Sequence, residues 1–114
     1  MNLVQTVILL SLASLFFAAG AAAGVIRVPD DQPTIAAGLA AAGAGDTVLV
    51  APGVYQENLL WPSTGGIRLI GEGGPAETIV DGRGLGSVIE IAGGADSTTL
   101  IKGLTLQNGR AYGG

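Results

Sequence analysis

The feature that most constrains the fold is a set of short strand-like segments, separated by glycine-rich turns, that recurs roughly every twenty residues. The first of these segments is Thr47–Asn58, TVLVAPGVYQEN. Its residues Val48 and Val50 lie two apart, which is the spacing that places one set of side chains on the buried face of a strand. Pro52 and Gly53 then turn the chain, because proline fixes φ and glycine accepts positive φ, and a second strand begins at once.

The alternation repeats at matched offsets and forms two interleaved ladders. The first ladder contains Val48 and Val50, then Ile67 and Leu69, then Ile89 and Ile91. The second contains Leu59–Trp61, then Ile79–Gly82, then Leu100–Gly103. One shared period predicts a parallel β-solenoid, because each strand pairs with its counterpart one coil away. An antiparallel sandwich also has short strands at regular spacing, but it does not explain matched side chains at fixed offsets.

The same offsets predict which residues lie side by side on neighbouring coils. The predicted neighbours are Arg68 with Glu90, Asp81 with Lys102, Gly71 with Gly93, and Gly82 with Gly103. The first two pairs join opposite charges, which is mildly favourable across strands and contributes at most about 1 kcal/mol for an exposed pair. At the end of the last strand, Asn108 is expected in the left-handed backbone region.

The stretch before the repeat, residues 24–46, predicts one strand and one helix. The strand is Val25–Pro29, which ends at a proline. The helix is predicted from an apolar stripe at helical spacing among alanines, namely Ile35, Leu39 and Ala42. We expect this helix to cover one end of the solenoid core, with Gly43 as its stop.

Further residues refine the predicted helix. Pro33 suits its first turn, and Asp30 and Asp31 place negative charge near the positive end of the helix dipole. Gly38 lies in its middle and weakens it by about 1 kcal/mol relative to alanine. We therefore expect the helix to be held by packing rather than by intrinsic propensity.

Residues 1–23 have the pattern of a secretory signal peptide. Asn2–Gly20 carries no charged side chain, and its apolar run leads into the small residues Ala21–Ala23. An N-terminal membrane anchor is the alternative, but the apolar run is short and the A-x-A pattern favours cleavage. We predict cleavage between Ala23 and Gly24, and a secreted or cell-surface location.

The composition argues against several classes of function. The net charge of −4 disfavours nucleic acid and anionic membrane surfaces, both of which are bound through basic patches. The sequence has no cysteine, so export brings no disulfide framework. It also has no histidine, which excludes Ser-His-Asp and Cys-His nucleophile systems and His-ligated zinc within these residues. We expect no cofactor, and no membrane insertion of residues 24–114.

Three blocks of the sequence together resemble a known family. PTIAAGLAAAGAGDTVLVAPGVYQENL, IRLIGEGGPAETIVDG and TTLIKGLTLQNG are similar to the opening of the right-handed parallel β-helix proteins of the pectin-lyase-like superfamily. The P-G-x-Y-x-E-N turn at Pro52–Asn58 and the I-x-G-E-G…T-I-V-D-G block are similar to the start of pectinesterases. The ending GLTLQNGRAYGG is similar to the repeats of bacterial surface and adhesin β-helices, including chlamydial polymorphic outer-membrane proteins.

The resemblance implies an all-β fold, a right-handed parallel β-helix with an N-terminal capping α-helix. Residues 1–23 would be the signal peptide, residues 24–46 the first strand and capping helix, and residues 47–114 roughly three coils. An open solenoid end exposes unpaired backbone and apolar side chains. We therefore expect the chain to be the N-terminal part of a longer protein whose later coils cover that end, and residues 24–114 alone to aggregate or melt with weak cooperativity.

For function, the resemblance implies an exported protein that binds or processes polysaccharide. If it is an enzyme, the class would be a carbohydrate-active esterase, lyase or hydrolase. In pectinesterases the catalytic residues lie in later coils, so no catalytic residue is assigned here. The alternative is a cell-surface structural or adhesive β-helix without catalysis, and the fold alone does not decide between them.

Two groups of side chains are candidate sites. Glu72, Glu77 and Asp81 are carboxylates near a glycine-rich turn, and carboxylate oxygens are the ligands that calcium prefers. An ordinary solvated turn is the favoured interpretation. Trp61 and Tyr55 offer aromatic faces on which a sugar could stack. The favoured interpretation is that they cover a turn.

Two weaker motifs are rejected on the sequence. Asp30 and Asp31 are adjacent, so their side chains diverge, which disfavours an acid–base pair. Gly71–Gly74, GEGG, is glycine-rich, but no helix pattern follows it to bind a phosphate. We interpret Gly71–Gly74 as a turn.

Overall fold

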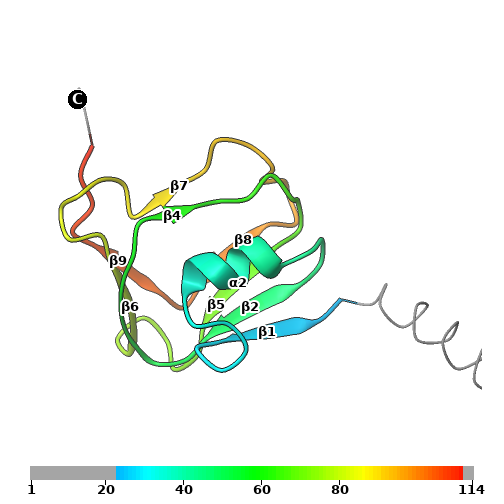
Figure 1. Ribbon diagram of the computed structural model, residues 1–114, viewed down its shortest axis with the longest axis horizontal. Coiled ribbons are helices and arrows are strands. Elements are labelled where there is room, and N and C mark those ends of the chain that lie inside the picture. The colour runs from blue at the N-terminus through cyan, green and yellow to red at the C-terminus, as the bar shows by residue number, and fades with distance from the viewer. Residues whose placement is uncertain (1–22, 112–114) are drawn as a thin grey trace, which may run out of the picture.

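The computed structural model describes residues 23–111, so the predicted signal peptide, apart from Ala23, lies outside the described residues. Within this range the chain forms a parallel β-solenoid of about three turns. Figure 1 shows its sheets around a common interior, with one short helix beside them. The predicted mainly-β parallel solenoid is therefore confirmed.

The described residues form three parallel sheets. In chain order the elements are β1 (Val25–Val28), α2 (Ile35–Ala41), β2 (Thr47–Val50), β3 (Gly53–Gln56), β4 (Leu59–Leu60), β5 (Arg68–Gly71), β6 (Thr78–Asp81), β7 (Ile89–Glu90), β8 (Leu100–Lys102) and β9 (Thr105–Gln107). The sheet orders are β1-β2-β5-β8, β3-β6-β9 and β4-β7. Neighbouring strands in every sheet are parallel. Successive turns of the chain therefore place strands of the same sheet next to each other, as a solenoid requires.

The predicted constant period near twenty residues is wrong for the second coil. One coil runs from residue 47 to residue 67, and the next runs from residue 68 to residue 99. The connection between β3 and β4 is residues 57–58, whereas that between β6 and β7 is residues 82–88. Hydrogen-bond ladders constrain only the strands, so the turns between sheets can differ in length from coil to coil.

The unequal coils also overturn the predicted neighbours. The observed neighbours are Leu100 for Arg68, Gln107 for Asp81, Ile70 for Lys102, Leu60 for Glu90, Gly103 for Gly71, and Asn108 for Gly82. Ile89 pairs with Leu59 in a different sheet from Leu69. Asn108 does have positive φ, at 56°, as predicted.

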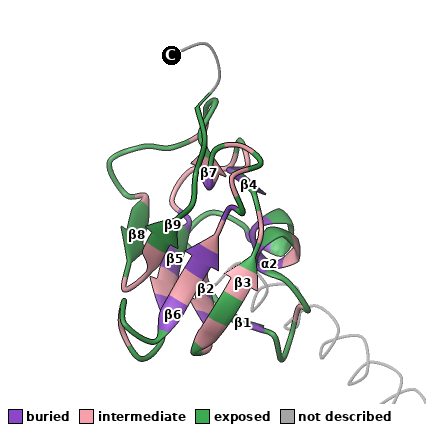
Figure 2. Ribbon diagram, turned by 90° about the vertical axis from the view of Figure 1, so that its left-hand side faces the viewer, coloured by how far each residue is buried: buried purple, intermediate pink, exposed green. Residues whose placement is uncertain are grey.

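The inward-facing residues of the first coils follow the predicted alternation. Val48 pairs with Leu69 rather than with the predicted Ile67, a slip of two residues that leaves the same face inward because side chains alternate with period two. The fully buried apolar side chains include Val28, Ile35, Leu39, Val48, Val50, Leu59, Ile67, Leu69 and Val80. Figure 2 shows buried positions alternating with less buried ones along β2, β5 and β6.

Helix α2 packs against β1, β2 and β4 and contributes the predicted stripe to the core. Ile35 and Leu39 are fully buried, and Ala42 is nearly so. Gly38 is also buried, and a Cβ there would lie 3.0 Å from methyl groups of Val28 and Val48. The glycine thus lets α2 approach the first sheet closely, so packing offsets its low helix propensity, as expected.

The predicted charges at the start of α2 are replaced by a residue from another coil. The helix begins after Thr34, whose hydroxyl accepts a hydrogen bond from the Ala37 N–H at 3.1 Å, so Pro33 precedes the cap. Asp31 instead accepts a bond from the N–H of Arg27 in β1, at 2.8 Å. The carboxylate of Glu57 accepts bonds from the N–H groups of Ile35 and Ala36, at 2.9 and 3.0 Å. Glu57 therefore supplies the negative charge that the helix N-terminus favours.

The helix ends differently from the expectation for a glycine stop. Gly43 follows the C-cap Ala42, but it is not among the glycines with positive φ. Its N–H donates to a carboxylate oxygen of Asp46 at 2.8 Å. A side-chain acceptor beyond the helix, rather than a left-handed glycine, thus fixes the chain as it leaves α2.

Replacing Glu57 by alanine should destabilise the protein. The Glu57→Ala variant loses two charge-assisted bonds to α2, so the free energy of unfolding should fall by about 1.5–3 kcal/mol. Chemical denaturation followed by the fluorescence of Trp61, the single tryptophan and a buried one, measures it. Glu77→Ala is the matched control, because Glu77 is exposed and its side chain makes no hydrogen bond within the described residues. Equal losses in the two variants would contradict the role of Glu57.

Candidate functional site

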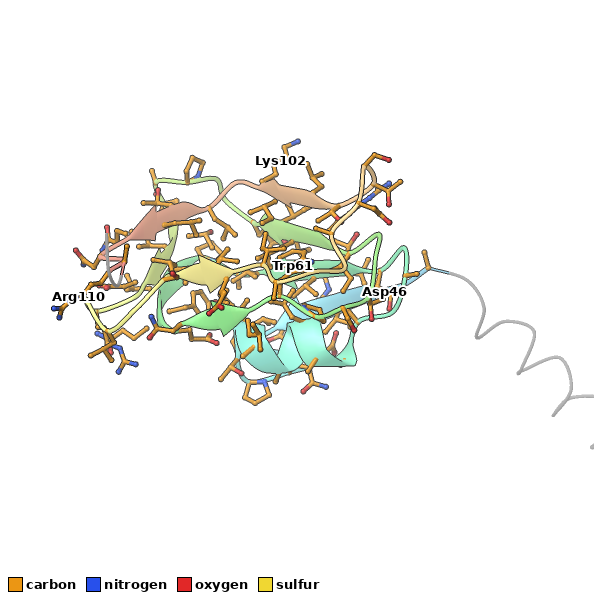
Figure 3. All side chains as sticks on the ribbon, turned by 90° about the horizontal axis from the view of Figure 1, so that it is seen from above. Asp46, Trp61, Lys102 and Arg110 are labelled. Atoms are coloured by element: carbon orange, nitrogen blue, oxygen red, sulfur yellow. The ribbon has the colours of Figure 1, made fainter. Side chains whose placement is uncertain are left out.

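The two aromatic residues do not form a sugar-stacking platform. Trp61 is only 3% exposed and packs in the core, at the centre of the molecule in Figure 3. Tyr55 packs against the same core, and its hydroxyl donates to the Ala51 carbonyl oxygen at 2.7 Å. Burial, and then the nearby charge of Glu57, raise the pKa of Tyr55. Because the Trp61 ring is buried and the Tyr55 ring is partly buried against the core, the two rings do not form the stacking platform considered above, and the single Trp serves packing.

The three carboxylates considered for calcium do not converge on one point. Within residues 23–111, no group of three or more acidic, histidine or cysteine side chains is arranged to hold a metal ion. Asp81 accepts hydrogen bonds from the Arg83 N–H at 2.8 Å and from the Asn108 amide at 3.1 Å. These two donors, in that order, lower the pKa of Asp81. Glu72 lies elsewhere, 3.8 Å from the Arg27 guanidinium.

The glycine-rich segment Gly71–Gly74 contains the predicted turn, although its first residue, Gly71, still belongs to β5. Gly73 and Gly74 both have positive φ, at 86° and 85°, and the chain then enters β6 rather than a helix. Thr78, which is fully buried, donates its hydroxyl to the Glu72 carbonyl oxygen at 2.6 Å. The segment therefore connects two sheets, and no helix N-terminus is present there to bind an anion.

The P-G-x-Y-x-E-N motif, expected as a turn, contains strand β3 and has a structural role that its spacing alone did not reveal. Glu57 holds α2, as described above, and Tyr55 closes the preceding turn. The amide of Asn58 donates to the carbonyl oxygens of Gly82 and Ser87, at 3.2 and 3.1 Å, in the next coil. Consecutive polar side chains of the motif therefore join the helix and two coils. The motif was visible in the sequence, but the residues to which Glu57 and Asn58 bond are more than twenty positions away along the chain.

A shallow groove along one corner of the solenoid is the strongest candidate for a binding site. Its volume is about 520 Å³, and its lining residues are Ala44, Gly45, Gly65, Gly66, Arg68, Asp96 and Thr98. The first two lining turns are joined by the Gly45 N–H, which donates to the Gly66 carbonyl oxygen at 3.1 Å. A Cβ at Gly65 would meet the Asp96 carboxylate, so the glycine lets that side chain lie close to the backbone of the second turn. Sequence analysis missed this groove because it depends on the true coil lengths.

One wall of the groove is a carboxylate that is already satisfied. The Thr98 N–H and hydroxyl both donate to one oxygen of Asp96, at 2.9 and 2.6 Å. These bonds, with the hydroxyl contributing most, lower the pKa of Asp96. Asp96 is therefore ionised at neutral pH and shapes its own loop. It is poorly suited to donate a proton as a general acid.

The same groove is also lined by a cation with no ion-pair partner among the described residues. Arg68 is exposed on the outward face of β5, and within the described residues no carboxylate lies within ion-pair distance of its guanidinium. The predicted partner Glu90 lies in β7, in another sheet. A guanidinium presents a planar set of donors that matches a carboxylate or a pair of hydroxyl groups. The groove can therefore bind an acidic or hydroxyl-rich molecule.

A second groove, of about 360 Å³, has three leucines in its lining. Its lining residues are Asn58, Leu59, Leu60, Leu85, Gly86, Ser87 and Glu90. The side chains of Leu60 and Leu85 are 66% and 59% exposed. Exposed leucines next to one another favour contact with another apolar surface.

Comparisons with protein-family models, curated proteins and solved structures find no match to this chain. The resemblance to the pectin-lyase-like superfamily therefore stays a prediction based on the blocks quoted above. None of the helices that the structure describes is long and apolar enough to cross a membrane.

Acid should destabilise the fold through three aspartates. Backbone donors lower the pKa of Asp46 (Gly43, then Gly24), and the bonds described above lower those of Asp81 and Asp96. An aspartate whose pKa is lower in the folded state than in the unfolded state stabilises the fold. Its contribution to stability is complete above the unfolded-state pKa of about 3.9 and is lost as the pH falls through the folded-state pKa. We expect the melting temperature to be nearly constant between about pH 7 and pH 5 and to fall below about pH 4.

Thermal denaturation across this range measures the effect. The Asp81→Asn variant should show a shallower fall, because the substitution removes one of the titrating groups. Asp30→Asn is the control, since Asp30 accepts no side-chain hydrogen bond in the part of the chain that the structure describes. Identical profiles for Asp81→Asn and the unaltered chain would contradict the explanation.

Proposed function

We propose that the chain is the N-terminal portion of an exported, pectin-lyase-like β-helix protein that binds or processes an extended polysaccharide, with no complete active site in this chain. The proposal includes right-handed coils and a capping role for α2. The observed parallel solenoid supports it. So do the contacts of α2 with β1, β2 and β4, which bury Ile35 and Leu39 over the first strands.

The observation that carries the proposal is a groove lined both by the unpaired guanidinium of Arg68 and by glycines. Gly45, Gly65 and Gly66 add no side chains to the lining, so a flat sugar ring can approach the backbone closely. The guanidinium then faces the carboxylate or hydroxyl groups of the sugar. An exposed groove at the corner of a solenoid also suits a polymer, whose chain continues beyond the site at both ends.

The same groove favours binding over catalysis. Hydrolysis of a glycosidic bond commonly uses two carboxylates on either side of it. Among the described lining residues, Asp96 is the only acidic one, and its pKa is lowered by its bonds to Thr98. Any chemistry of the complete protein would then depend on residues outside this groove.

The second candidate function is a structural or adhesive role at the cell surface. Leu60 and Leu85 favour it, because they place exposed apolar side chains around the second groove. Such a surface suits contact with another protein rather than with a sugar. The two functions therefore use different faces of the solenoid and can be separated by substitution.

Removing the Arg68 guanidinium should weaken polysaccharide binding. We expect Arg68→Ala to reduce affinity for polygalacturonate by about tenfold or more, because a charge-assisted hydrogen bond contributes about 1.5–3 kcal/mol. Affinity electrophoresis and calorimetry with polygalacturonate and with a neutral glucan measure the loss. Lys102→Ala is the matched control, because it removes one exposed positive charge from the neighbouring strand β8.

Three outcomes decide between the functions. A loss confined to Arg68→Ala supports the glycan groove. Equal losses in both variants indicate non-specific attraction of charge and contradict the groove. If no glycan binds, and Leu60→Asp abolishes attachment of the exported protein to cells, the adhesive function replaces the first.

A further inference from the structure

The backbone nitrogen of Gly24 is bound by a carboxylate. It lies 2.8 Å from Oδ1 of Asp46, to which it donates a hydrogen bond, and Oδ2 of the same carboxylate accepts the Gly43 N–H at 2.8 Å. The Gly24 carbonyl oxygen accepts the Thr47 N–H at 2.9 Å, which begins the pairing of β1 with β2. Figure 3 shows Asp46 at the end of the molecule where β1 starts.

This nitrogen belongs to the peptide bond at which the sequence predicts cleavage. Ala21–Ala23 forms the small-residue pattern that precedes the predicted cut, and Gly24 follows it. Ala23 is exposed and precedes the residues that pair in the sheet. The atom that Asp46 binds is thus the atom that hydrolysis would convert into the new amino terminus.

We propose that Gly24 is the amino terminus of the processed chain and that its ammonium group is held by Asp46, which fastens the edge strand β1 to the solenoid. A signal-peptidase-type hydrolase and water supply the reaction. Water adds its oxygen to the Ala23 carbonyl carbon, the Ala23–Gly24 bond breaks, and the Gly24 nitrogen leaves as an amine that is protonated at neutral pH. Cleavage occurs on the unfolded chain during export, so the bond to Asp46 forms afterwards.

The surroundings suit a positive charge at this position. An ammonium forms shorter and stronger bonds to a carboxylate than a neutral N–H does. The Gly43 and Gly24 N–H groups already lower the pKa of Asp46, so the carboxylate is ionised. Residues 43–45, α2 and β2 bring no charged side chain. The other charged residues on the adjacent strands are Arg27 on β1, which faces Glu72, and Arg68 on β5.

Asp46 would then anchor the outer strand β1 through an ion pair, which is stronger than its bond to a neutral peptide N–H. β1 is the outer strand of its sheet, paired with β2 on one side only. Outer strands fray and invite pairing with other chains. An ion pair between the Gly24 ammonium and Asp46 would fix the N-terminal end of β1 to the sheet.

The amino-terminal sequence of the exported protein, followed by titration of its amines, tests the proposal. Within residues 24–114 the processed chain has two amines, the α-amine of Gly24 and the side-chain amine of Lys102. Reductive methylation with ¹³C-formaldehyde labels both, keeps them chargeable, and leaves each ammonium one N–H. We expect the terminal sequence Gly-Val-Ile, and an α-amine that titrates about one pH unit above the ordinary range of about 7.7–8.0.

Two comparisons isolate Asp46. In Asp46→Asn the pKa of the α-amine should return to the ordinary range, while the titration of Lys102 is unchanged. Asp81→Asn is the matched control, because it removes one carboxylate elsewhere, and it should leave the titration of both amines unchanged. If Asp46→Asn fails to fold, titration of the unaltered protein in urea gives the unfolded α-amine for comparison. A terminus at any other residue, or an α-amine that titrates alike in the native and urea-unfolded protein, overturns the proposal.

Discussion

The structure depends on the hydrogen-bond ladders between parallel strands of neighbouring coils. They fix which residues lie side by side, because each ladder pairs a strand with its counterpart one turn later. The apolar residues of the first sheet then stack in a column in which Val48 lies beside Leu69. The core contains no disulfide and is made almost entirely of apolar side chains. Its stability therefore depends on the burial of that column. Only the turns between sheets remain free to vary in length, and the candidate groove lies among those turns.

Carboxylates that accept hydrogen bonds from backbone N–H groups fix the helix and the turns, which lie outside the strand ladders. Glu57 binds the start of α2, and Asp46 joins the end of α2 to the start of β1. Asp96 organises the third turn of the groove. In a parallel solenoid the connections leave many unpaired N–H groups, and a short acidic side chain is a strong acceptor for them. Three of the acidic residues, Glu57, Asp46 and Asp96, serve the fold in this way.

The sequence was sufficient for the parallel solenoid and for most inward-facing residues, because alternation depends only on neighbours along the chain. It was insufficient for the register. The 82–88 connection lengthens the second coil, so a constant period matched Ile89 and Ile91 to Ile67 and Leu69, although Ile89 pairs with Leu59 in another sheet. The groove was missed for the same reason, since Arg68 was expected to pair with Glu90. Trp61 was assigned to the surface of a turn because burial of a single aromatic residue depends on which sheets meet around it.

The most direct test of this arrangement is disulfide trapping, which the absence of native cysteine makes clean. The structure pairs Leu60 with Glu90 on neighbouring strands, whereas a constant period pairs Arg68 with Glu90. Paired residues on adjacent strands bring their Cβ atoms within reach of a disulfide. On mild oxidation the L60C/E90C variant should form an intramolecular disulfide, detected as the loss of two hydrogens by mass, and R68C/E90C should not. Cross-linking of R68C/E90C without that of L60C/E90C would contradict the unequal coils and the three-sheet solenoid.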